Sequence, residues 1–124
     1  MGRILSVNGT QIMTTNTAMA AKLEFCSDRA VIRLRGQFDF PSRNTLSESL
    51  AKAIARPTIK HIEIDLREVS YIDSSGLGQL LLAQDKADKV KKRISLANPH
   101  GRVKEILAVT QFNQRFTITP PFES

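Results

Sequence analysis

The sequence feature that most limits the fold is a regular exchange between two hydrophobic periodicities. Apolar and polar residues alternate in "KLEFC", "AVIRLRG" and "HIEIDL", which is typical of β-strands. Residues 39–56 and 77–90 instead repeat apolar side chains every three or four positions, which is typical of helices. "RISLAN" and "RFTIT" predict two further strands, and residues 101–110 predict a third helix. The predicted order is β-β-α-β-α-β-α-β.

This order predicts an α/β fold with a mixed, mostly parallel sheet. Strands that alternate with helices join through crossovers and lie parallel in one sheet. Only Ser27, Asp28 and Arg29 separate the first two strands, so these strands predict an N-terminal antiparallel hairpin over residues 21–35. Because crossover units flank "HIEIDL" on both sides, we expect residues 61–66 in the interior of the sheet. In such open sheets, functional groups gather at the carboxyl ends of the strands.

The chain divides into one domain with short ends. Residues 1–20 are rich in Thr and Asn and lack periodicity, which predicts a flexible leader. Residues 21–119 form the predicted domain, and residues 120–124 form a short tail. Within the domain, we expect Asp39 or Ser42 to cap the first helix.

The composition favours a globular protein of the cytoplasm. The 124 residues suffice for one modest core, and no apolar run approaches the length of a membrane-spanning helix. We therefore expect no membrane insertion. The single cysteine, Cys26, has no partner for a disulfide or a metal site and lies in the predicted strand "KLEFC". We expect Cys26 to pack as a small apolar side chain, which fits a reducing, cytoplasmic setting.

The net charge of +6 raises the hypothesis of nucleic-acid binding. Lys86, Lys89 and residues 91–93 gather near the end of one predicted helix, where cations suit the negative end of the helix dipole. The chain has one Tyr and no Trp, and no motif that enters a groove of DNA is present. The sequence therefore predicts no direct binding to nucleic acid.

The stretch "SYIDSSGLGQLLLA" leads from a predicted strand into a helix. Asp73, Ser74 and Ser75 are all residues that cap helices well, and Gly76 allows a tight turn or close packing. A purely structural start of a helix is therefore one interpretation of the stretch.

Catalytic interpretations of the same stretch lack their required residues. A nucleophile elbow needs Gly-x-Ser-x-Gly, and neither serine has a glycine two positions before it. His61 and His100 have no partner that would make either a general base. "GLGQLL" lacks the third glycine of a dinucleotide fingerprint, and no phosphate-binding loop with Gly-Lys-Ser/Thr is present. We expect no enzymatic activity, no metal and no cofactor.

A phosphoacceptor interpretation has a physical basis. A serine at the start of a helix presents its hydroxyl beside free backbone N–H groups, which favour an anion. A phosphate there would add about 1.5 to 2 negative charges without unfolding the helix. The surface would change while the fold persisted, as a reversible binding switch requires.

The segment "HIEIDLREVSYIDSSGLGQLLLAQDKA" resembles the STAS domain in its anti-sigma factor antagonist branch. "AVIRLRGQFD" resembles the second strand of that family, which ends in a Gly-x-x-Asp turn. "RISLAN" and "GRVKEILAVT" fall where the family has its last βαβ unit. The resemblance covers about residues 21–119.

This resemblance implies a phosphorylation-controlled partner switch. The implied acceptor is Ser75, the second serine of the motif, with Ser74 as the alternative. Asp39, Asp73, Ser74, Ser75 and Gly76 form the implied partner-binding surface. The implied partners are a serine kinase that is also an anti-sigma factor, of the histidine-kinase-like ATPase type, and a PP2C-type phosphatase. The unphosphorylated form binds the kinase and frees its sigma factor.

The family also allows a second function. Some STAS domains are regulatory subunits docked on membrane transporters, such as lipid-transport ABC transporters, and these need no serine that cycles between two states. The charge of +6 contrasts with the acidic charge of several relatives. This leaves open the identity of the kinase, the oligomeric state and the output, which could be a sigma factor, a response regulator's output domain or another signalling enzyme.

Overall fold

The computed structural model describes residues 6–7, 10–11 and 19–122. Most of the predicted leader, residues 1–20, lies outside the described residues, so the leader stays a prediction. Two short strands, β1 (Ser6–Val7) and β2 (Thr10–Gln11), pair antiparallel.

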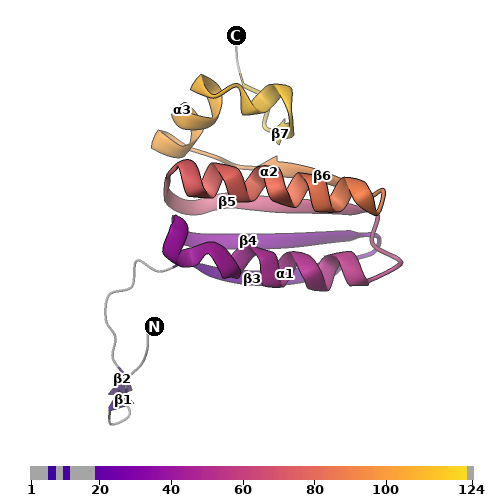
Figure 1. Cartoon of the computed structure of the whole chain (residues 1–124), viewed down its shortest axis with the longest axis horizontal. Coiled ribbons are helices and arrows are strands. Elements are labelled where there is room, and N and C mark those ends of the chain that lie inside the picture. The colour runs from indigo at the N-terminus through magenta and orange to yellow at the C-terminus, as the bar shows by residue number, and fades with distance from the viewer. Residues whose placement is uncertain (1–5, 8–9, 12–18, 123–124) are drawn as a thin grey trace.

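The domain is built on a five-stranded mixed sheet (Figure 1). The order across the sheet is β3-β4-β5-β6-β7, with β3 and β4 antiparallel and every other pair parallel. The predicted α/β fold, the N-terminal hairpin and the interior position of β5 are thereby confirmed. The strands are β3 (Ala20–Cys26), β4 (Arg29–Phe38), β5 (His61–Ile72), β6 (Arg93–Ala97) and β7 (Thr117–Thr119).

The sequence of crossovers determines where the helices lie. Each connection from β4 onward steps to the next strand in the same direction, and right-handed crossovers of this kind put their helices on one face of the sheet. Figure 1 shows α1 and α2 side by side in front of the sheet, with α3 toward β7. The helices are α1 (Arg43–Ala55), α2 (Ser74–Lys89) and α3 (Gly101–Val109), and two 3₁₀ turns are η1 (Phe40–Ser42) and η2 (Phe112–Gln114).

One core fills the space between the sheet and the helices. Alternate residues of β4 and β5 point into it, as the sequence alternation predicts. Burial of these side chains, at about 25 cal/mol per Å² of apolar surface, is the main force that holds the layers together. Fully buried members include Ile32 and Leu34 of β4, Ile62, Ile64 and Leu66 of β5, Leu46 and Leu50 of α1, and Leu80 of α2.

The start of α1 differs from the prediction that Asp39 or Ser42 caps it. Neither side chain makes a cap hydrogen bond. The buried Ser42 hydroxyl instead donates to the Gln37 carbonyl at 3.1 Å and accepts from the Met19 backbone N–H at 3.3 Å. The serine therefore joins the segment before β3 to the end of β4, and η1 begins the helical path in place of a capped turn.

The prediction that Cys26 is packed is wrong, because its side chain is exposed. Leu23 and Phe25 of β3 pack against the core. Successive residues of a strand point to opposite faces, so Cys26 faces away from the helices on an edge strand.

The opposite face of the sheet is lined by charged pairs between neighbouring strands. Arg29 Nη1 lies 2.6 Å from Glu63 Oε1. Arg33 pairs with two carboxylates, through Nη1 to Asp65 Oδ2 at 2.9 Å and through Nε to Glu24 Oε1 at 3.1 Å. Parallel sheets are usually covered on both faces. Among the residues that the structure describes, this face carries cross-strand ion pairs where a second apolar layer would otherwise pack.

His61, on this charged face, should make stability depend on pH. Its Nε2 lies 2.8 Å from the Ser95 hydroxyl of β6. Burial, reinforced by Arg29 and Arg93, lowers the pKa of His61 from its ordinary value of 6.5. The folded state thus binds this proton more weakly than the unfolded state. The contribution to the unfolding free energy is complete above pH 6.5 and is lost as the pH falls toward the lowered folded-state pKa.

We predict that His61→Gln, which retains a hydrogen-bonding group toward Ser95, makes the free energy of unfolding less sensitive to pH. Urea denaturation from about pH 7.5 to about pH 5 measures this, because a histidine titrates in that range. The difference in the free energy of unfolding between wild type and His61→Gln should narrow as the pH falls. Parallel curves for wild type and variant would contradict it.

Candidate functional site

Two turns meet at the carboxyl edge of the sheet. Phe38, the last residue of β4, is the register partner of Ile72, the last residue of β5. The backbone N–H of Asp73 donates to the Phe38 carbonyl at 3.3 Å. The residues that follow the two strands, Asp39 and Asp73, therefore begin adjacent turns. The sheet brings together the two sequence segments that carry the predicted site residues.

Asp73 caps α2. Its Oδ1 accepts a hydrogen bond from the Gly76 N–H at 3.0 Å, and its carbonyl accepts the Leu77 N–H at 3.0 Å. The first N–H groups of a helix have no intrahelical carbonyl partner, so those of Ser74 and Ser75 are available to a ligand. The two serines are thus the first residues of a capped helix, at its positively polarised end.

Gln79 links Ser75 to the neighbouring turn. Its side-chain Nε2 donates to the Ser75 hydroxyl oxygen at 3.3 Å and to the Asp39 carbonyl at 3.2 Å. Ser75 is half-buried under this contact, whereas Ser74 is exposed. Sequence reasoning missed Gln79, although its place four residues after Ser75, one helical turn along, was a signal for it.

Two acceptor atoms at this junction lack a partner. Asp39 Oδ1 and Gln79 Oε1 are buried, and no donor among the described residues reaches either one. A buried polar atom left without a hydrogen bond costs about 1–3 kcal/mol. Unsatisfied buried atoms are uncommon in folded proteins, so this pair makes the junction of the two turns unusual.

Exposed aromatic side chains lie close in sequence to both turns. Phe40 follows Asp39 and is 59% exposed, and Tyr71 comes just before the last residue of β5 and is 45% exposed. The Arg43 guanidinium stacks over the Phe40 ring at 4.2 Å and also donates to the Phe40 carbonyl at 3.2 Å. Large exposed aromatic and arginine side chains are the residues that most often dominate binding energy at protein interfaces.

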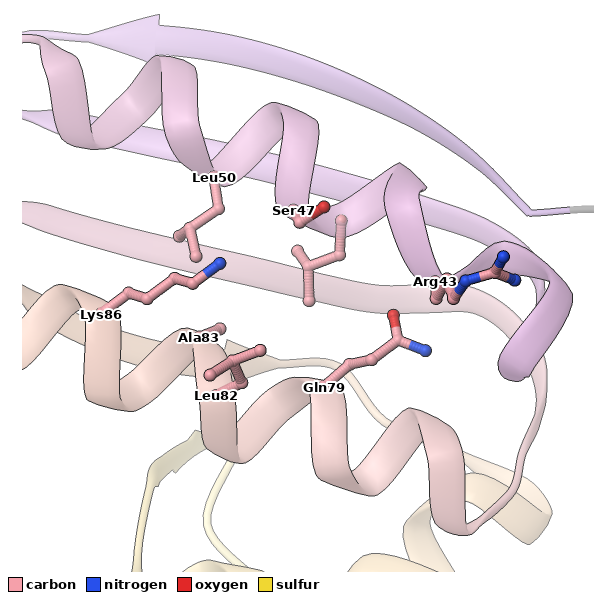
Figure 2. Close-up of a pocket in the computed structure, with 8 residues that line it drawn as sticks. Arg43, Ser47, Leu50, Gln79, Leu82, Ala83 and Lys86 are labelled. Atoms are coloured by element: carbon pink, nitrogen blue, oxygen red, sulfur yellow. The ribbon is translucent and has the colours of Figure 1, made fainter.

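A hollow between α1 and α2 opens beside the site. Figure 2 shows its lining, with Arg43, Ser47 and Leu50 projecting from α1 and Gln79, Leu82 and Lys86 from α2. Gln79 therefore belongs both to the serine turn and to the wall of this hollow.

Two classes of site are not found in the described part of the chain. No group of three or more His, Cys, Asp or Glu residues is placed to hold a metal ion there. None of the helices in these residues is long and apolar enough to cross a membrane.

The STAS domain family matches residues 20–124. The chain belongs to the STAS domain family. A STAS-domain containing protein of Pseudomonas aeruginosa is 38% identical over 88 residues, which cover 71% of this chain and 85% of that protein. An anti-sigma F factor antagonist of Lysinibacillus sphaericus is 29% identical over 79 residues, which cover 64% of this chain and 68% of that protein.

Solved structures that contain the same fold include anti-sigma factor antagonists and, over part of its length, a transporter. The anti-sigma factor antagonist SpoIIAA, in its unphosphorylated form, has a TM-score of 0.67 and 25% identity, covering 81% of this chain and 88% of that one. The phosphorylated form of SpoIIAA from Bacillus has a TM-score of 0.62 at 24% identity, and the match covers 81% of this chain and 91% of that one. A murine solute carrier 26 anion transporter has a TM-score of 0.68 at 16% identity, covering 88% of this chain and 21% of that one. This STAS domain is thus related to anti-sigma factor antagonists.

Gly76 allows the close contact between α2 and β4 in this STAS domain. A Cβ atom at position 76 would lie 2.5 Å from the Phe38 carbonyl oxygen and 2.7 Å from Ile72 Cγ1. The first of these atoms belongs to the backbone of β4 and cannot move aside without shifting the strand end. Only glycine lets the helix start approach the sheet edge this closely.

We predict that Gly76→Ala lowers the free energy of unfolding by about 2 kcal/mol through overpacking. Gly78→Ala, in the same helix, is the matched control, because a Cβ atom there meets nothing within 4 Å. That control should raise the stability by about 0.5–1 kcal/mol through helix propensity. Urea denaturation of the three proteins checks both values, and equal effects at the two positions would refute the close-contact explanation.

Proposed function

We propose that this STAS domain is a partner-switching regulator of the anti-sigma factor antagonist type, controlled by reversible phosphorylation of Ser75. The observation that carries the proposal is the position of the Ser75 hydroxyl. It lies in the first turn of α2 and is bound by Gln79, which also binds the turn at Asp39. The relation to anti-sigma factor antagonists, one of which has been solved with and without phosphate, supports it.

The helix start can accommodate a phosphate without losing its cap. The cap bond joins the Asp73 side chain to the Gly76 N–H and does not involve the Ser75 hydroxyl. Free N–H groups and the positive end of the helix dipole favour an added anion. We therefore expect the fold to persist when Ser75 is phosphorylated.

The same phosphate would change the surface that a partner meets. It would add about 1.5 to 2 negative charges at the hydroxyl that Gln79 now contacts, and Gln79 joins that hydroxyl to the turn at Asp39. In the proposal, the unphosphorylated surface of Asp39, Asp73, Ser74, Ser75 and Gly76 binds the partner, and the phosphorylated surface repels it.

The proposed partners are a serine kinase of the histidine-kinase-like ATPase type, which is also an anti-sigma factor, and a PP2C-type phosphatase. The domain itself acts by binding in the cytoplasm, without enzymatic activity and without direct contact to nucleic acid. The output is a sigma factor or another process regulated through the kinase.

Ser74 is the alternative acceptor. It is the more exposed serine, whereas the Ser75 hydroxyl is half-buried and oriented by Gln79. Exposure favours Ser74, and the defined orientation of the hydroxyl, together with the family motif, favours Ser75.

A transporter-docked regulatory subunit is the second candidate function. The structural likeness to the solute carrier 26 anion transporter favours it. Such a subunit needs no cycling serine, so the Ser-Ser pair favours the switch. Neighbouring genes discriminate between the two, since a switch would be encoded beside a kinase and a phosphatase, and a transporter subunit beside a permease and an ATPase.

We predict that the kinase encoded beside this gene adds one phosphate to wild type and to Ser74→Ala, but none to Ser75→Ala. Intact-mass measurement after incubation with ATP reads the result directly. Ser75→Ala should remain within about 1 kcal/mol of wild-type stability, because only the hydroxyl contact to Gln79 is lost. It should still bind the kinase, because alanine adds neither charge nor bulk, whereas Ser75→Asp should bind more weakly.

The two alanine variants distinguish a wrong choice of acceptor serine from a wrong switch model. A phosphate on Ser75→Ala but not on Ser74→Ala would move the assignment to Ser74. If wild type and both variants accept no phosphate, the switch itself is wrong.

A further inference from the structure

A groove runs between α1 and α2, starting at Gln79 beside the serine turn. Its apolar floor and wall include Leu50, Ile54 and Leu82, and Leu82 is 52% exposed. The hollow shown in Figure 2 continues past Leu50 and Lys86 into a second hollow toward the ends of both helices. We call this continuous surface the α1–α2 groove.

The charges that line the α1–α2 groove have one sign. Of the described residues that line it, Arg43, Lys86 and Lys89 are basic and none is acidic. Lys89 lies 3.3 Å from the exposed Asp85 carboxylate, but none of the ion pairs among the described residues involves Lys86. Figure 2 shows the Lys86 side chain reaching across the groove toward Leu50. A basic side chain that extends over an apolar floor is placed to meet an acidic group on a bound apolar segment.

The groove is long enough to lie along one more helix. α1 has 13 residues, which at 1.5 Å per residue gives a groove about 20 Å long, or between three and four helical turns. The furrow between two adjacent helices accepts the side-chain ridge of a third, as in other helix-in-groove complexes.

We propose that the α1–α2 groove binds an amphipathic helix of a partner protein that carries leucine-like residues on one face and Asp or Glu beside them. The apolar face packs on Leu82 and on the partly exposed Ile54, and the acidic residues pair with Lys86 and Arg43. The proposal thereby gives a role to the basic residues Arg43, Lys86 and Lys89 that line the groove.

The groove also gives the serine switch a means of acting at a distance, an extension that rests on the proposed function. Gln79 lines the groove and contacts the Ser75 hydroxyl, so a phosphate on Ser75 adds negative charge at one end of the groove. An acidic helix would then be repelled by that charge. The partner would be released without any rearrangement of α1 or α2.

The test titrates a synthetic amphipathic peptide of about 14 residues, with Leu on one face and Glu elsewhere, into the ¹⁵N-labelled full chain. A peptide with Lys in place of Glu is its counterpart. The Glu peptide should shift the amides that line α1 and α2 in a saturable way. The Lys peptide should bind at least about tenfold more weakly, because opposite charge selects the partner.

Charge reversal at Lys86 provides the matched comparison. Lys86→Glu should weaken the Glu peptide about tenfold, whereas Arg102→Glu, an equal charge change on the exposed face of α3, should alter affinity less than about twofold. Equal effects of the two variants, or no saturable shift of groove amides, would overturn the proposal.

A membrane surface is the rival occupant. Sedimentation with phosphatidylcholine vesicles that contain a quarter phosphatidylglycerol separates the two. Retention on the vesicles that Lys86→Glu abolishes would overturn the proposal in favour of an anionic lipid, and no retention is expected. The peptide titration uses unphosphorylated protein and no kinase, so its failure would leave the Ser75 proposal standing, and failed phosphorylation would leave the peptide result standing.

Discussion

The close approach of the α2 start to the end of β4 is the contact on which the rest of the site depends. Gly76 lies where any side chain would collide with the Phe38 carbonyl, and Asp73 donates its own N–H to that same carbonyl. These two contacts hold the first turn of α2 against the carboxyl edge of the sheet. Because β4 and β5 end at paired residues, the turn at Asp39 is held there as well. The serine motif is therefore positioned by the rigid sheet.

That position separates the fold from the chemistry of the serines. Asp73 satisfies the helix start through its own carboxylate, and the core begins below it with Ile72 and Leu80. Ser74 and Ser75 take no part in this cap bond and are not among the buried residues of the core. A change of charge on Ser75 then acts on Gln79, on Asp39 and on any molecule docked over them. A site of this kind can change what it binds while the domain remains folded.

The sequence predicted the order of elements along the chain, the antiparallel hairpin and the interior strand, because the alternation that marks each of these strands is local. "HIEIDL" alternates strictly, and crossover helices on both sides left β5 no other place than the interior. Cys26 was misjudged because its neighbours pack inward and it lies one residue out of phase with them. The Ser42 contacts were missed because the hydroxyl turns back to the Gln37 carbonyl of β4 and meets the N–H of Met19, which is distant in sequence. The α1–α2 groove could not be predicted, because its charges come from two helices whose relative rotation only the packed core defines.

The most direct test of the central claim uses the full chain with phosphoserine installed at position 75 during translation, so that no kinase is needed. Amide spectra of this protein and the unmodified chain should differ only at residues 39–43, at residues 73–79 and along the groove. Thermal unfolding midpoints should agree within about 2 °C, because a shift of that size reflects well under 1 kcal/mol in a domain this small. Shifts spread over the core strands, or a large loss of thermal stability, would contradict a switch that changes the surface and preserves the fold.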